Sequence, residues 1–111
     1  KNNLMIFERK EQAVVSSRVI AERFDKQHQH VTQAIENLIS ENSLVISMFI
    51  KSYYETERGR AYKEYLMNRD GFSLLVMGFT GKEALEWKLK YIDAFNKMEA
   101  FIQDEDLLNG C

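Results

Sequence analysis

Two runs of apolar residues with helical spacing follow one another in the first third of the chain. The first is carried by Val19, Ile20 and Phe24, and the second by Val31, Ala34, Ile35 and Leu38. Apolar residues three or four positions apart lie on one face of a helix, so each run predicts a short amphipathic helix. The polar stretch 25–27 separates them. Residues 17–38 therefore predict a helix-turn-helix whose second helix spans Gln27–Leu38.

The first of these helices carries a signal at each end. Ser17 is a candidate N-cap, because its hydroxyl can accept a hydrogen bond from a free N–H of the first turn. Asp25 stands in the turn, where glycine is usual, and aspartate is one of the few other residues that adopt a left-handed backbone. The motif is therefore compatible with Asp25.

A long β-hairpin is predicted after the two helices. From Leu44 the apolar period changes to two and continues through Glu55, and a second alternating run covers Arg60–Met67. The connection ends in Gly59, which supplies the positive φ that a tight turn needs. A charged hairpin in this position is typical of a wing.

A smaller hairpin is predicted at the N-terminal end. Short β-prone runs at 4–7 and 13–15 flank a charged stretch, so the chain is expected to turn near 9–12.

The C-terminal part predicts a pair of helices. Asp70 is a candidate cap for a short, mostly apolar helix over 71–77. Thr80 and Glu83 have the spacing of a capping box, which predicts a long helix that runs to about Asp106.

The long helix carries two apolar stripes. One contains Leu85, Leu89, Ile92 and Phe95, and the other contains Ala84, Trp87, Tyr91, Met98 and Phe101. A helix with two apolar stripes is expected to pack one stripe on its own domain and the other on a partner. We expect a homodimer through this helix. The candidate partner residues are Trp87, Tyr91, Met98 and Phe101.

Composition and charge are compatible with one domain. At 111 residues, 45 % of them hydrophobic, the chain can bury a substantial core. We therefore predict a single α+β domain over 1–111, a winged helix-turn-helix with an N-terminal β-hairpin, a long β-wing and a long C-terminal helix.

The formal net charge of −2 does not itself favour binding to nucleic acid. Positive charge nevertheless collects with the helix-turn-helix and the hairpin, and negative charge with the C-terminal helix.

Three other features of the sequence indicate the cellular compartment and the extent of the chain. The single Cys111 excludes an intramolecular disulfide and fits a reducing cytosol. The longest apolar run, Leu74–Met77, is too short to span a bilayer, and no signal-peptide pattern is present. Because the chain lacks an initiator Met and stops at Asn-Gly-Cys, we expect the N-terminal fragment of a longer protein.

Two runs resemble the phage regulatory protein Rha family. The first contains Val14-Val15-Ser16-Ser17-Arg18, Ala21-Glu22, Phe24, Lys26, His28, Val31, Ile35 and Asn37-Leu38. The second starts with Gly59-Arg60, Tyr65 and Met67, is centred on RDGFSLLVMGFTGKEAL, which begins at Arg69, and continues through Lys88, Tyr91-Ile92, Ala94-Phe95-Asn96 and Met98-Glu99. The chain is also similar to KilA-N-like and antirepressor domains, and the resemblance covers roughly 4–100. Lys63 and Glu11-Gln12 depart from the pattern, outside the predicted reading helix.

This resemblance implies a phage- or prophage-encoded DNA-binding regulator in the cytoplasm of a bacterial host. Hydrogen-bonding side chains on the second helix would read base edges, and cations of the motif and the hairpin would contact phosphates. No cofactor is expected. The candidate DNA-binding residues are Ser17, Arg18, Lys26, Gln27, His28, Gln29, His30, Thr32, Gln33, Lys51, Arg58, Arg60 and Lys63.

Other chemistries fit the sequence less well. His28 and His30 are two positions apart, so they point to different faces of a helix and do not predict a metal site. Gly78–Glu83 imitates a phosphate loop but has Glu83 where the loop needs Ser or Thr. We find no catalytic set and predict a protein that is not an enzyme. The alternative function is an antirepressor-like module that binds a repressor through its C-terminal helix.

Overall fold

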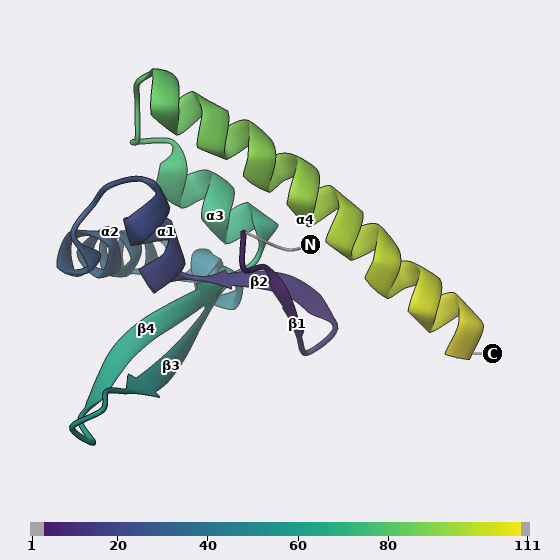
Figure 1. The fold of residues 1–111 in the computed structure, drawn as a ribbon, viewed down its shortest axis with the longest axis horizontal. Helices are drawn as coiled ribbons and strands as arrows, with labels where there is room; N and C mark the ends of the chain where they lie inside the picture. Colours follow the sequence, from purple (N-terminus) through teal and green to yellow (C-terminus); the bar gives the residue numbers. More distant parts are fainter. Residues whose placement is uncertain (1–3, 110–111) are drawn as a thin grey trace.

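The computed structural model describes residues 4–109, with side chains as far as residue 104. It is an α+β fold in which a curled antiparallel sheet of order β1-β2-β4-β3 is combined with helices (Figure 1). The elements are β1 (Phe7–Arg9), β2 (Gln12–Ser16), α1 (Ser17–Arg23), α2 (His28–Glu41), the 3-10 helix η1 (Ser43–Met48), β3 (Phe49–Glu55), β4 (Ala61–Met67), α3 (Arg69–Val76) and α4 (Lys82–Asn109). Cys111 lies outside the described residues.

The N-terminal hairpin turns where the sequence predicts. Lys10 and Glu11 both have positive φ, 53° and 66°, which is the pattern of a two-residue hairpin turn of type I′. The first strand, however, begins at Phe7 rather than at Leu4. Met5 has a φ of 63°, and this left-handed residue interrupts the extended backbone before the strand.

The long hairpin is also confirmed. Gly59 has a φ of 80°, and its N–H donates to the carbonyl of Thr56 at 2.9 Å. The strand after α2 starts five residues later than Leu44, because 43–48 form η1 instead. Asn42 causes this difference: its side chain accepts from the N–H of Leu44 at 3.0 Å and caps the short helix.

The helix pair α1–α2 is present, but Ser16 caps α1 in place of the predicted Ser17. The hydroxyl of Ser16 accepts from the N–H of Arg18 at 3.0 Å, whereas Ser17 is buried. At the other end, the N–H of Lys26 donates to Ala21 at 2.8 Å and that of Asp25 to Glu22 at 3.3 Å. With Asp25 at a φ of 56°, these bonds form a Schellman turn, so Asp25 adopts the left-handed conformation expected of it.

The C-terminal helices begin at other caps than those predicted. Asn68, not Asp70, caps α3, because its Oδ1 accepts from the N–H of Gly71 at 2.9 Å. Helix α4 begins at Lys82, and the carbonyl of Gly81 accepts its first bond from Leu85 at 3.0 Å. Gly81 therefore occupies the N-cap position that the sequence assigns to Thr80, at a φ of 108°.

Helix α4 packs on the core with most of the stripe that the sequence assigns to a partner, together with Phe95 of the other stripe. Tyr91 and Phe95 are fully buried, and Phe72 of α3 lies against both rings at centroid distances of 5.1 and 5.6 Å. The hydroxyl of Tyr91 donates to the backbone carbonyl of Leu4 at 2.9 Å, which permits its burial. Burial raises the pKa of Tyr91 to about 12.

The other stripe stays exposed except for Phe95. Leu85, Leu89 and Ile92 are 55 %, 60 % and 42 % exposed. Trp87 and Met98 pack against the core with Tyr91, so three of the four candidate partner residues contribute to the fold instead. Phe101 is exposed, on a different side of α4 from this stripe. No helix in the described part of the chain is long and apolar enough to cross a membrane.

Candidate nucleic-acid interface

The exposed face of α2 carries uncharged hydrogen-bonding side chains. Val31 and Ile35 turn into the core, so Gln29, His30, Gln33 and Asn37 lie on the opposite face and are exposed. The Gln33 amide donates to Oδ1 of Asn37 at 3.1 Å. Thr32 is half-buried, and its hydroxyl donates to the carbonyl of Gln29 at 3.0 Å. We call Gln29, His30, Gln33 and Asn37 the amide face.

Ser17 and His28 form a junction between α1, α2 and β4. The Ser17 hydroxyl lies 2.8 Å from Nε2 of His28 and accepts from the N–H of Tyr65 at 3.0 Å. Burial lowers the pKa of His28, the positive charge of Arg18 lowers it further, and Glu64 partly opposes both. A neutral imidazole can accept a hydrogen bond from the Ser17 hydroxyl at Nε2. The predicted DNA contact of Ser17 is wrong, because the residue is fully buried.

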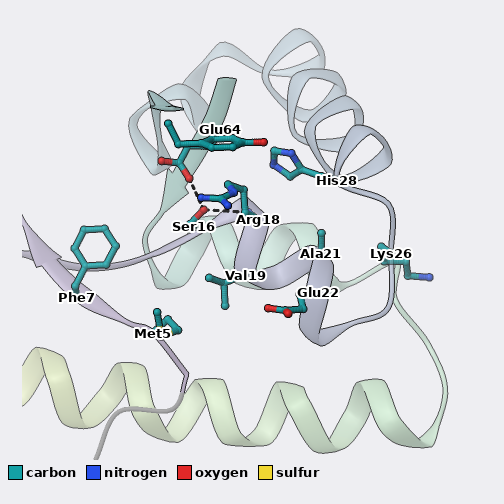
Figure 2. Close-up of a pocket in the computed structure, with 11 residues that line it drawn as sticks. Met5, Phe7, Ser16, Arg18, Val19, Ala21, Glu22, Lys26, His28 and Glu64 are labelled. Carbon is teal, nitrogen blue, oxygen red and sulfur yellow. Dashed lines mark hydrogen bonds between the residues drawn. The ribbon is translucent and has the colours of Figure 1, made fainter. Parts of the chain in front are cut away.

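A groove runs between β1, α1 and the long hairpin (Figure 2). Its polar wall begins at Ser16, whose hydroxyl donates to Glu64 at 2.6 Å. The guanidinium of Arg18 lies 3.7 Å from the centre of the Tyr54 ring, and His28 approaches the same ring edge-on at 6.5 Å. Arg18 is exposed but oriented by this stacking, which fixes a cation beside α2.

Three side chains hold the long hairpin against α2. Glu36 accepts hydrogen bonds from Nζ of Lys63 and, at 3.0 Å, from the hydroxyl of Tyr65. The bond from Lys63 lowers the pKa of Glu36, and the same bond raises the pKa of Lys63. We call Glu36, Lys63 and Tyr65 the brace. Lys63, predicted to contact phosphate, is thus engaged with α2.

The remaining candidate cations differ in their surroundings. Arg58 and Arg60 are exposed at the hairpin tip, and Arg60 donates to the hydroxyl of Tyr62 at 3.4 Å. Lys51 is exposed on β3. Lys26 is exposed next to Gln27 in the turn, and its ammonium lies 5.0 Å from the Phe79 ring centre. The hairpin tip that carries these two cations extends away from the helices (Figure 1).

The structure also identifies positioning residues that sequence reasoning did not select. Asn37 follows Gln33 by four positions, which is the spacing that brings two helical side chains together, so this pair could have been found. Glu36, Tyr54 and Tyr65 left no such local signal, because their partners lie on other elements. Within the described residues, no group of three His, Cys, Asp or Glu side chains could hold a metal ion.

Comparisons with known proteins place the chain among phage regulators. Residues 15–100 match the family model of the phage regulatory protein Rha. An uncharacterised protein of Haemophilus influenzae is 34 % identical over 99 residues, which cover 86 % of this chain and 57 % of that protein. An uncharacterised 22.8 kDa protein of Salmonella phage P22, from the gp15-gp3 intergenic region, is 36 % identical over 80 % of this chain and 46 % of its own length.

A third relative carries a functional name. It is YoqD of Bacillus subtilis, a candidate antirepressor derived from the SPbeta prophage, 26 % identical over 86 % of this chain and 40 % of its own length. The chain thus spans about half the length of these curated relatives. No solved structure matches it. The family match extends over most of the chain, which belongs to the phage regulatory protein Rha family.

Proposed function

We propose that this chain is a DNA-binding domain of a phage or prophage regulator. Helices α1 and α2 act as a helix-turn-helix, α2 enters the major groove, and the β3–β4 hairpin acts as a wing on the adjoining backbone. This is the winged helix-turn-helix that the sequence predicts, and residues 1–111 form one such domain. The match to a family of phage regulatory proteins favours a regulatory protein over an enzyme, and we place this regulator in the cytoplasm of a bacterial host.

The observation that carries this proposal is the order and pairing of the elements. Strand β2 leads into α1, the Schellman turn at Asp25 joins α1 to α2, and the long hairpin follows. The strand before α1 pairs with the far strand of the hairpin, Ser16 opposite Leu66. This pairing places the hairpin beside α2, and the brace joins the two, so the amide face and the tip cations are carried by elements that are bonded to each other.

Fluorescence anisotropy tests this function. The chain is titrated against a random-sequence duplex pool and against the DNA around its own gene, at two salt concentrations. We expect salt-sensitive binding, because cations that contact phosphates release counterions. The double variant Gln33→Ala with Arg60→Ala removes one base reader and one tip cation, and we expect it to lose binding.

A matched control separates this loss from unfolding. Gln103→Ala with Lys97→Ala likewise removes one carboxamide and one cation, at exposed positions in the C-terminal half of α4, which lies away from α2 and the wing (Figure 1). We expect that variant to bind like the unaltered chain. Absence of binding to either DNA at low salt and high protein concentration would refute the DNA-binding function.

The second candidate function is binding to a repressor protein, and two observations favour it. The Bacillus subtilis relative is named as a candidate antirepressor. The stripe of Leu85, Leu89 and Ile92 on α4 is exposed and could bury apolar area against such a partner. The homodimer predicted from the sequence would compete for the same surface.

Calorimetry with the purified repressor of the same phage or prophage distinguishes this candidate. Leu89→Lys should then abolish binding, because it places a charge in the middle of the stripe. Ile46→Lys is the control, since Ile46 is a similarly exposed aliphatic residue on η1. Loss of binding in Gln33→Ala instead would contradict the stripe as the contact surface.

A further inference from the structure

The side chains available on α2 favour one kind of base pair. The 14 residues of α2 include neither lysine nor arginine, and its exposed face offers Gln29, His30, Gln33 and Asn37. Guanine presents two acceptors in the major groove, and its usual partner is Arg or Lys in a bidentate contact. Adenine presents one acceptor and one donor, which match a carboxamide. The amide face is therefore chemically suited to adenine.

The hydrogen bond within the amide face strengthens this match. Nε2 of Gln33 donates one hydrogen to Oδ1 of Asn37 and becomes oriented along the helix. Its second amide hydrogen and its carbonyl oxygen have no partner among the described residues. Those two groups are the donor and the acceptor that pair with N7 and N6 of adenine.

Three cations next to α2 are engaged elsewhere. Arg18 stacks on Tyr54, Lys63 is bound to Glu36 in the brace, and the ammonium of Lys26 lies 5.0 Å from the centre of the Phe79 ring. None of them is available to replace the missing arginine on the reading helix without giving up its contact. The charged side chains that could select guanine are thus held at the border of the amide face, where they suit phosphates.

The wing tip adds an independent observation. Arg58 and Arg60 flank Gly59 and are both exposed. Arg60 lies three residues from Lys63 of the brace, on the side of the tip, which is roughly 10 Å along a strand. The tip arginines therefore lie beyond the contact between the hairpin and α2, as a wing that reaches a neighbouring groove requires.

We propose that the duplex site of this chain is rich in A·T pairs, with α2 reading adenine in the major groove and the tip arginines entering an adjacent narrow minor groove. Runs of A·T have a narrow minor groove whose negative potential attracts arginine. Both observations therefore select the same base pairs in neighbouring grooves. This inference rests on the proposed DNA-binding function and names the sequence class that it recognises.

Base analogues test the major-groove part. Sites are selected from a randomised duplex library with the chain, and each adenine of the selected site is replaced in turn by 7-deazaadenine, which lacks the N7 acceptor. We expect the selected sites to be A·T-rich and at least one replacement to weaken binding about tenfold. Gln33→Ala should bind more weakly but no longer respond to that replacement, whereas Gln103→Ala should respond like the unaltered chain.

Inosine tests the minor-groove part. An I·C pair lacks the amino group that G·C places in the minor groove, so it separates groove shape from base identity. We expect I·C pairs in the flank to preserve binding and G·C pairs to weaken it several-fold. Arg58→Ala with Arg60→Ala should bind both flanks equally, and Lys82→Ala with Lys97→Ala, which removes two cations from α4, should keep the difference.

The outcomes separate this inference from the function on which it rests. Binding to G·C-rich selected sites, or equal affinity for adenine and 7-deazaadenine throughout, would overturn the A·T inference and leave DNA binding intact. Failure to bind any duplex at low salt would overturn both. A·T-rich sites with a response to 7-deazaadenine that depends on Gln33 would support the inference.

Discussion

At the scale of single residues, His28 links the fold to pH. Burial and Arg18 hold its pKa below the ordinary value of 6.5, and Glu64 opposes them. The unfolded chain therefore binds this proton at a higher pH than the folded chain does. Stability attributable to His28 is complete above pH 6.5, and it declines as the pH falls from there toward the folded-state pKa.

We expect thermal unfolding to show this decline. His28→Gln should flatten the change in Tm between about pH 7.5 and pH 5, because it removes the group that takes up the proton on unfolding. His30→Gln leaves His28 in place and should keep the dependence of the unaltered chain. Equal pH dependence in all three proteins would contradict the assignment to His28.

Gly71 is required for a close approach between α3 and η1. A Cβ at this position would lie 2.8 Å from the carbonyl oxygen of Met48, which also accepts from the N–H of Asn68 at 3.1 Å. Gly71→Ala should destabilise the fold by about 1–3 kcal/mol, because the backbone must shift. Gly78→Ala is the control, since a Cβ there meets nothing within 4 Å. Chemical denaturation compares them, and equal midpoints would refute the steric argument.

At the scale of elements, the brace should decide how firmly the wing is held. Glu36→Gln removes the charge that Lys63 and Tyr65 bind, while leaving the hairpin turn at Gly59 unchanged. We expect hydrogen exchange of the β3–β4 amides near residue 63 to become faster, with little change in Tm, because the contact is near the surface. Glu41→Gln, an exposed change on the same helix, should leave the exchange rates as they are.

The elements themselves were largely predictable because their signals are local. Period and turn residues specified both hairpins and both helices of the pair. The observed N-caps lie one or two positions from the predicted ones. Ser16 and Ser17 have the same capping chemistry, and both Asn68 and Asp70 have a side-chain oxygen that can accept from a first-turn N–H. The choice between the two serines depends on a tertiary contact: the Ser17 hydroxyl is occupied by His28 and Tyr65.

Contacts between distant elements set the limit of prediction for the site. The sequence indicated the exposed readers Gln29, His30 and Gln33, whose spacing places them away from the core. It did not indicate which stripe of α4 packs inward, because that depends on Phe72 in another helix. The same limit applies to the brace, whose members are 27 and 29 positions apart.

At the scale of the whole molecule, charge distribution governs the salt dependence of the proposed DNA binding. The chain carries a formal net charge of −2, so attraction to DNA depends on the few cations that face it. Exposed cations on the proposed surface are Arg18, Lys26, Lys51, Arg58 and Arg60. Five phosphate contacts predict a slope of roughly −4.5 for log K against log salt concentration, per bound chain.

Removing the tip cations should change this slope by a defined amount. Arg58→Ala with Arg60→Ala eliminates two of five contacts and should bring the slope to roughly −2.7. Lys82→Ala with Lys97→Ala lowers the net charge equally but removes cations of α4, so the slope should stay near its original value. Anisotropy titrations across a series of salt concentrations, at known stoichiometry, measure all three. If both double variants reduce the slope of log K against log salt concentration by the same amount, the net charge governs binding and the wing has no special contact with DNA.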